Sequence, residues 1–547
     1  MNWAVKLRAA SPDDLSLRKG IFDLRAPTFL SDQDHANLWL ALSEAFKGAE
    51  GRQVLSSVDL PGLLESSAEG LLGTKELAPQ ACSNILLACA RLKWKRETLV
   101  NHLTACVLES KPSKQHLANT AYALGELAVD VGYKPRPEDV QGLAKAVNAL
   151  LSSEDGWNSL KPLDVANLLL GCANLRAAEG NAHPVLAEIA KALSAECTRS
   201  QFAGFKAQDL TNTLWALTKM GCAEQSCFAA AAEAAALPSF TDNAMPQSWA
   251  NLWYALALAR HRPSEHLLLK TCDAEAMLQK RSNGQDCANL LWALANLRLY
   301  DERLVDALAE RLGELLRQGR KQLTAQALGN CLWSLAVMGP DVLSRHSGLV
   351  EGLLREAERR WSSDGRSAIA EVGLAQLWQT QVELAHVGGG ELQRILGAGE
   401  GREGSLVAAM RANAATRVAA VASVKPTSLQ REVAIALEQL REQSGPGAIV
   451  SVQQGYVVEK EGQFSEALVS LACGRCVAVE TVFEGEVYSN PSHDRVLTGP
   501  VILRHRHLGR CFGTGNVVTV PFWEWKAAKA KGEQLRYLSN RLGLGEA

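Results

Sequence analysis

Residues 285–297 read QDCANLLWALANL, and close copies of this stretch recur along the first two thirds of the 547-residue chain. When the copies are aligned on their asparagine, successive asparagines lie 35 to 48 residues apart. The eight full copies are centred on Asn37, Asn84, Asn119, Asn167, Asn212, Asn251, Asn289 and Asn330, and a degenerate ninth copy is centred on Gln376. This spacing is typical of two-helix solenoid repeats, in which each unit buries its apolar face against its neighbours. The sequence therefore predicts a mostly α-helical protein built on an α-solenoid of about eight or nine repeats.

Positions in the repeat are counted here from the asparagine. Position −4 is a glutamine in seven of the eight full copies and Leu163 in the other: Gln33, Gln80, Gln115, Gln208, Gln247, Gln285 and Gln326. Position +3 is large and apolar: Leu40, Leu87, Tyr122, Leu170, Trp215, Tyr254, Trp292 and Trp333. Position +4 is small: Ala41, Ala88, Ala123, Gly171, Ala216, Ala255, Ala293 and Ser334. Because residues four apart share a helical face, Gln and Asn should form one stripe, and the small +4 residues should let a neighbouring helix approach closely.

Almost every other position of this helix is apolar, which predicts a helix packed between others, with one narrow polar stripe. The stripe holds the Gln, the Asn and a variable residue at position +7: Glu44, Arg91, Glu126, Asn174, Lys219, Leu258, Asn296 and Val337. Two fixed positions and one variable position would suit a protein that reads one RNA base per repeat. That interpretation makes Arg91, Asn174, Lys219 and Asn296 candidate RNA contacts. The alternative is a buried ladder of amides between repeats, with position +7 as ordinary surface.

Composition limits the possible partners. The formal net charge is −2 and the sequence pI is about 6.6, so any nucleic-acid surface has to be a local patch. Thirteen cysteines, mostly at apolar helix positions, indicate buried thiols in a reducing compartment and no disulfide framework. We find no apolar run of the roughly 18 residues that a membrane span needs, and expect no membrane partner. Residues 1–30 form an N-terminal extension without a signal-peptide core, and give only a weak transit-peptide signal.

The composition changes twice after the repeats, which we place at residues 31–385. Residues 386–427 are rich in Gly and Ala, and this predicts a flexible linker. Residues 428–547 show helical periodicity first, then several short β-type runs, and then two further helical segments around the strand 517–521. This order predicts a small α/β domain at the C-terminus.

Two stretches resemble known families. The copy LTNTLWALTKMG at residues 210–221 resembles the octotricopeptide repeat and the related leucine-rich repeats of FAST-kinase-like proteins. The tail resembles a RAP domain, on the strength of VAVE at 477–480, TGPVILRHRHL at 498–508, VVTVPFWEW at 517–525 and the closing Tyr537-Leu538. The resemblance implies an RNA-binding factor of the mitochondrion or chloroplast that supports the stability, processing, splicing or translation of a transcript. Its implied partners are single-stranded RNA and other RNA-processing proteins, with no cofactor and no small-molecule substrate. The repeats alone would equally suit a protein–protein scaffold.

The RAP domain in turn resembles PD-(D/E)XK nucleases, which use an acid and then an acid-x-Lys motif to hold a divalent metal. The matching residues are Glu466 and then Glu480-Thr481-Val482, with valine where the family has lysine, while Glu484 falls where RAP domains usually carry an Asp. Without the lysine, the charge of the transition state lacks a stabilising group. We therefore expect binding without catalysis, and an RNA endonuclease remains the alternative.

Basic residues of the tail are further candidates for RNA contact. Arg504, Arg506 and Arg510 share one short predicted helix with two histidines, and Lys526 and Lys529 follow beside Trp523 and Trp525. Cations close to aromatic rings suit phosphate contact and base stacking. The alternative is a solvated helix face with both tryptophans in the core. Cys473 and Cys476 form a CxxC motif without a second pair at zinc-site spacing, so no metal site is predicted.

Overall fold

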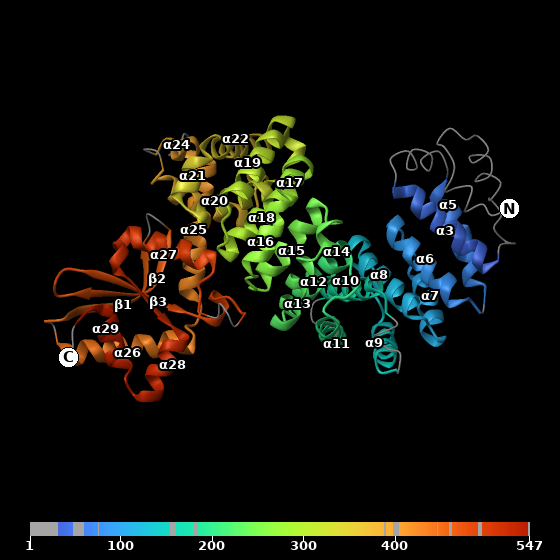
Figure 1. The fold of residues 1–547 in the computed structure, drawn as a ribbon, viewed down its shortest axis with the longest axis horizontal. Coiled ribbons are helices and arrows are strands. Elements are labelled where there is room, and N and C mark those ends of the chain that lie inside the picture. Colours follow the sequence, from blue (N-terminus) through green and yellow to red (C-terminus); the bar gives the residue numbers. More distant parts are fainter. Residues whose placement is uncertain are drawn as a thin grey trace. The chain divides into compact units, whose positions relative to one another are not determined.

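A computed structural model describes residues 31–47, 59–74, 76–153, 160–179, 184–387, 390–397, 404–445, 447–458, 462–490 and 495–544. The predicted N-terminal extension lies outside these residues. The described chain is mostly helical and carries a four-stranded sheet near its C-terminus, as the sequence predicted for the fold class (Figure 1). It divides into two compact units, residues 1–244 and 245–547, and each is described separately below.

In the first unit, helix pairs are stacked. The Asn-centred helices contact one another in sequence order: α3 (Asp32–Lys47), α6 (Pro79–Leu92), α8 (Lys114–Val131), α10 (Pro162–Glu179) and α12 (Ala207–Lys219). A second row stacks in the same order: α5 (Leu60–Leu72), α7 (Glu97–Glu109), α9 (Pro137–Leu151), α11 (Val185–Ser200) and α13 (Gln225–Ala235). The short helix α14 (Pro238–Thr241) follows. Each repeat therefore contributes one Asn-centred helix and one partner helix, as expected for a solenoid.

The second unit repeats the arrangement. Its Asn-centred row is α15 (Pro246–Leu258), α18 (Gly284–Leu297), α20 (Ala325–Met338) and α23 (Glu371–Leu384), followed by α25 (Leu406–Ser423). Its second row is α17 (Glu275–Arg281), α19 (Glu302–Gln318), α22 (Ser347–Asp364) and α24 (Glu391–Gly397), with α16 (Glu265–Asp273) and α21 (Pro340–Arg345) as short additions. The helices α24 and α25 lie in the stretch predicted to be a linker. The Ala-rich sequence of α25 favours a helix, and its Leu406, Val407 and Met410 are buried.

Small residues make this stacking possible. The +4 side chains of the eight full copies are buried, and Gly171 of α10 lies so close to α8 that a Cβ there would come within 2.2 Å of the Ala121 carbonyl oxygen. A Cβ on Gly125 of α8 would come within 2.6 Å of the Gly171 carbonyl oxygen. Two backbones can approach to this distance only where neither helix carries a side chain. The expectation for position +4 is confirmed.

The C-terminal part of the second unit is a small α/β domain. After α26 (Ser428–Ser444) come β1 (Ile449–Val458), β2 (Gln463–Leu471) and β3 (Cys476–Val482), then α27 (Gly499–Phe512), β4 (Val517–Pro521), α28 (Phe522–Lys531) and α29 (Gln534–Leu542). The sheet order is β1-β2-β3-β4, with β3 and β4 parallel and the other pairs antiparallel. Figure 1 shows α27 on one side of the sheet and α26, α28 and α29 on the other.

Alternation along the strands gives the sheet two different faces. Ala467, Val469, Val477 and Val479 point to an apolar core that also contains Leu437 of α26 and Leu538 of α29. Residues of opposite parity, including Glu466 on β2 and Glu480 on β3, belong to the other face, against which α27 packs. The acidic residues singled out in the sequence therefore lie on the face turned away from the core. None of the helices in the described ranges is both long and apolar enough to cross a membrane.

Candidate nucleic-acid interface

The polar stripe of the Asn-centred helices lies at their solvent edge. The seven −4 glutamines are exposed, and six of the eight asparagines are half-buried, with Asn119 and Asn330 buried. The +3 side chains are half-buried in every copy except the last, where Trp333 is 6% exposed. Exposed amides therefore run beside partly accessible apolar and aromatic side chains in each unit.

Hydrogen bonds join the amides of the stripe in two ways. Within one helix, Gln285 Nε2 donates to Asn289 Oδ1 at 2.7 Å, and Gln33 donates to Asn37 in the same manner at 3.2 Å. Between helices, Gln376 Nε2 donates to Asn330 Oδ1 at 2.9 Å. The bond between Gln376 and Asn330 therefore forms the predicted amide ladder between repeats. The Gln285–Asn289 and Gln33–Asn37 bonds stay within one helix and leave the glutamine at the surface.

Aromatic residues at position +3 lie next to one another or next to a cation. The rings of Tyr254 and Trp292, from adjacent repeats, have centroids 4.9 Å apart. The ammonium group of Lys219 lies 5.5 Å from the ring centroid of Trp215, one helical turn earlier. A half-accessible ring with a neighbouring cation is suited to stacking against a base and to contact with its phosphate.

The residues at position +7 fit neither the prediction of RNA contact nor the alternative of ordinary surface. Arg91 bonds to Glu44, the +7 residue of the preceding repeat, at 2.5 Å, and Asn174 donates to Glu126 of the preceding repeat at 2.7 Å. Asn296 donates to the main-chain oxygen of Trp292 in its own helix at 2.8 Å. Lys219 and Leu258 are exposed. Three of the four predicted contacts at this position therefore already have hydrogen-bond partners within the protein, two of them in the neighbouring repeat.

The arginines of α27 point into the protein. The carboxylate of Glu383, whose side chain has no exposed area, lies 3.2 Å from Arg506, 2.7 Å from Arg510 and 2.9 Å from His507. Burial would raise the pKa of Glu383, but hydrogen bonds from His507 and Arg510 outweigh this effect and lower it to about 2. Burial lowers the pKa of His507, whose Nε2 faces Glu383 and whose Nδ1 faces the Gln463 amide at 3.4 Å.

This cluster joins the C-terminal domain to the ends of the Asn-centred helices. Arg506 also donates to the carbonyl oxygens of Ala336 and Val337, which belong to the last turn of α20. Tyr488 Oη donates to the carbonyl oxygen of Asn296 in α18, and Gly499 lies against the carbonyl oxygen of Ala295. The carbonyls of a last helical turn lack partners within the helix and favour positive charge, so α27 provides what these ends require.

Arg504, on the same helix, belongs to a second and partly buried cluster. Its guanidinium lies 2.7 Å from Glu486 and 3.6 Å from Glu480. The main-chain N–H of Glu466 donates to Glu480 at 3.0 Å, so the two carboxyl groups are neighbours on adjacent strands. Burial and then the charge of Glu466 raise the pKa of Glu480, while Arg504 opposes them. Val482, where nucleases of the resembled fold have lysine, is buried. Glu484 is exposed, and its main-chain oxygen accepts a hydrogen bond from the Arg260 guanidinium.

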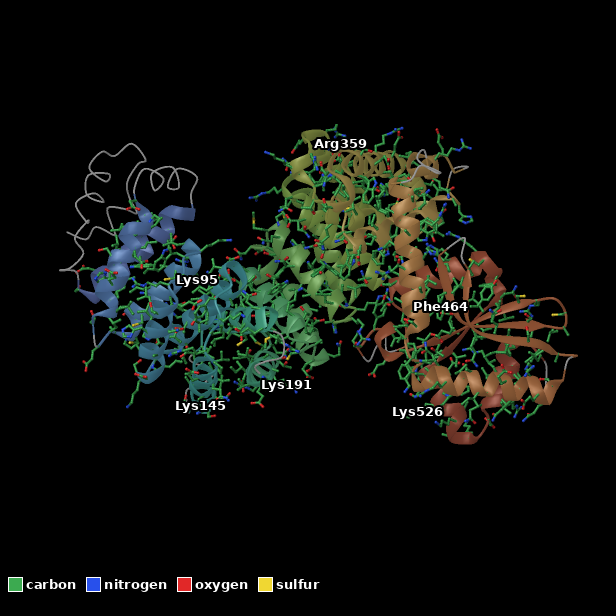
Figure 2. The ribbon with its side chains drawn as sticks, turned by 180° about the vertical axis from the view of Figure 1, so that it is seen from behind. Lys95, Lys145, Lys191, Arg359, Phe464 and Lys526 are labelled. Carbon is green, nitrogen blue, oxygen red and sulfur yellow. The ribbon has the colours of Figure 1, made fainter. Side chains whose placement is uncertain are left out.

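The remaining basic candidates lie on α28. Trp525 is buried and donates to Glu432 at 3.0 Å, and Lys529 pairs with the same carboxylate at 2.8 Å. Lys526 is exposed on this helix (Figure 2), and Trp523 is half-buried. Cys473 and Cys476 are exposed free thiols, and no cluster that could hold a metal ion occurs among the described side chains.

A cavity of about 640 Å³ lies between the acidic sheet face, α27 and the helices α15, α18, α23 and α25. Glu466, Glu480 and Arg504 line it, together with Trp378 and Arg417, which the sequence did not single out. Glu383 was missed as well, although one signal was present: it occupies position +7 of the ninth copy. The surfaces that line the cavity come from segments distant in sequence, and no local pattern marks them. A scan of protein-family models and a search of curated proteins found no match to this chain.

Proposed function

We propose that this protein binds single-stranded RNA along the polar stripes of its Asn-centred helices. The observation that carries the proposal is the recurrence, in each unit, of an exposed glutamine beside a half-buried +3 side chain. A base can stack on the +3 side chain while its edge bonds to an amide, and six of the eight full copies offer the same pair. The octotricopeptide-like sequence supports this assignment and implies a transcript of the mitochondrion or chloroplast.

The protein would act without chemistry, by holding a transcript segment and so affecting its stability, processing, splicing or translation. In this proposal the C-terminal domain has a smaller part in RNA contact than its arginines suggested, because those side chains are paired with Glu383, Glu480 and Glu486. Its exposed Lys526 remains a candidate phosphate contact. The domain is then the part that recruits processing partners, which is what its resemblance to RAP domains implies.

The test is charge reversal on the stripe. The substitutions Gln247→Glu, Gln285→Glu and Gln326→Glu are combined in one variant, and affinity for a pool of short single-stranded RNAs is measured by fluorescence anisotropy. The three glutamines are exposed, so the fold should be retained. We expect affinity to fall by about tenfold or more, because three negative charges would face the RNA backbone.

The matched control carries Gln318→Glu, Gln322→Glu and Gln453→Glu, three exposed glutamines outside the stripe. It should bind RNA like the wild type apart from the general effect of three added charges. Equal losses in the two variants would show that net charge, and not the stripe, governs binding. If the wild type shows no salt-dependent RNA affinity, the proposal fails and the protein-scaffold alternative gains support.

A further inference from the structure

The cavity of the second unit has the size of a small-molecule site. Its volume of about 640 Å³ falls within the roughly 300–1,000 Å³ that ligand pockets usually have. One wall is the acidic face of the sheet with α27, and the opposite wall is formed by Asn-centred helices and α25. The contacts of Arg506 and Tyr488 with the helix ends hold the two walls together.

The floor of the cavity presents hydrogen-bonding groups. Glu466 and Glu480 lie side by side there, and Gln430 donates to Glu466 at 2.9 Å. Because burial raises the pKa of Glu480, its carboxyl group favours the protonated form and can donate a hydrogen bond beside carboxylate acceptors. Carboxyl and amide side chains are the groups that proteins use to bond the edges of bases.

Arg504 makes this floor compatible with a negatively charged ligand. Its guanidinium lies 3.6 Å from Glu480 and 2.7 Å from Glu486, and it compensates the charge of the Glu486 carboxylate. Without it, the three neighbouring carboxyl groups would repel a phosphate. The Arg504 guanidinium therefore occupies the position between Glu480 and Glu486.

Aromatic side chains form part of the walls. Phe464 on β2, labelled in Figure 2, and Phe483 after β3 are half-buried and line the cavity, and Trp378 of α23 lines it from the opposite side. Rings of this kind offer flat apolar surface on which a base can stack. The cavity thus combines flat apolar walls with a polar floor.

The rim carries a cation that is available to a ligand. Arg417 lies on α25, lines the cavity and is exposed, and no ion pair or hydrogen bond of its side chain occurs within the described ranges. Val421, one turn further along the helix, is 53% exposed and also borders the cavity. An arginine without a protein partner at a pocket rim is well placed to bind a phosphate group.

We propose that this cavity binds one nucleotide, with its base against the floor and the aromatic walls and its phosphate at Arg417. The ligand is either a free mononucleotide or a single nucleotide of an RNA strand, since both present the same base and phosphate. In the second case the inference rests on the proposed RNA-binding function and adds a site to it, separate from the stripes.

The test uses isothermal titration calorimetry on the full chain with the four ribonucleoside monophosphates, with adenosine and with inorganic phosphate. We expect at least one monophosphate to bind more tightly than inorganic phosphate. Arg417→Glu should weaken that binding by about tenfold or more and leave adenosine binding unchanged, because only the phosphate contact is reversed. Phe464→Leu should weaken both the nucleotide and adenosine. Arg431→Glu, at an exposed arginine of α26 that does not line the cavity, is the control and should change neither.

Three results would overturn the inference: no binding of any monophosphate at millimolar concentration, binding of inorganic phosphate with equal affinity, or equal binding by wild type and Arg417→Glu. Competition with a short RNA distinguishes a free mononucleotide from a nucleotide of an RNA strand as the natural ligand. An RNA trinucleotide that displaces the monophosphate indicates an RNA strand, and failure to displace it indicates a free nucleotide. Loss of stripe binding in the Gln→Glu variant with intact monophosphate binding would separate the two sites, so either proposal can fail alone.

Discussion

Two sets of residues were predicted to contact RNA, and the structure places them in opposite environments. The glutamines of the Asn-centred helices are exposed beside half-buried +3 side chains. The arginines of α27, which read as the more obvious RNA contact, are bound to Glu383, Glu480 and Glu486 and to the ends of helices. A cluster of cations in a sequence thus gives no information on where the matching anions lie. A polar pattern that recurs in eight helices gives more information on the environment of its residues, because its period places them on one face of each helix.

The difference has a physical cause. A carboxylate without exposed area, such as Glu383, is tolerated only when cations and hydrogen bonds replace the water that it loses. Arg506, His507 and Arg510 are one helical turn or less apart, so one helix can supply all three groups. The glutamines and asparagines of the stripe carry no charge, and the pairs Gln285–Asn289 and Gln33–Asn37 bond to each other at the surface.

Replacing Glu383 tests most directly whether the α27 arginines are held inside the protein. Glu383→Ala should destabilise the second unit by about 3–5 kcal/mol, because it leaves two half-buried arginines without their anion. Chemical denaturation monitored by circular dichroism would measure it. The control is Glu351→Ala, which removes an exposed partner of Arg355 and should change the stability by less than about 0.5 kcal/mol. Similar small effects for both variants would mean that the α27 arginines are not held as described.

Low pH should destabilise the cluster of Glu383 with Arg506, His507 and Arg510. The pKa of Glu383 is lowered to about 2 from an ordinary value of 4.5, so its contribution to stability is complete above about pH 4.5 and is lost as the pH falls towards 2. The difference corresponds to about 3 kcal/mol. Urea unfolding at a series of pH values should show this slope in the wild type, and Glu383→Gln should remove it. An unchanged slope in the variant would assign the acid sensitivity to other groups.

The stripe depends on how closely its helices stack, and a single methyl group tests this spacing. Gly171→Ala should destabilise the first unit by about 1–3 kcal/mol, since the new Cβ would meet the backbone of α8. In an unobstructed helix the same change would stabilise by about 1 kcal/mol. Gly313→Ala in α19, where the nearest atom to the added Cβ is a flexible arginine side chain at 3.6 Å, should show that opposite sign. Thermal unfolding of the two variants gives the comparison.

Replacing Glu480 should have the smallest effect on stability, although Glu480 is also a buried glutamate next to an arginine. Its pKa is raised, so the folded state favours the neutral form and loses stability as the pH rises above the ordinary value. Glu480→Gln keeps a neutral group there and should leave stability at about pH 8 unchanged or raised by up to about 1 kcal/mol. A loss of more than about 2 kcal/mol would indicate a charged partner of Arg504. Incubation of the wild type and this variant with RNA and a divalent cation also tests the endonuclease alternative, which requires cleavage that Glu480→Gln abolishes.

Much of the fold follows from the repeat, and little of the site does. The spacing of the asparagines and the small +4 residues predicted stacked helix pairs, and the change of period after residue 428 predicted the α/β domain, because both depend on local periodicity. The contacts of Glu383 with α27 join residues more than 120 positions apart. Arg417 lies in a stretch whose glycines and alanines indicated a linker. Neither position has a local pattern that reports its environment, because charged residues such as Glu44 and Lys219 also occupy position +7 in other copies.

The central claim is that RNA lies on the stripes, and ultraviolet crosslinking of the full chain to single-stranded RNA, followed by mass spectrometry of the crosslinked peptides, tests it most directly. The account predicts crosslinks at +3 aromatics in both units, such as Trp215, Tyr254 and Trp292. Crosslinks confined to α27 and α28, with none in the Asn-centred helices, would contradict it.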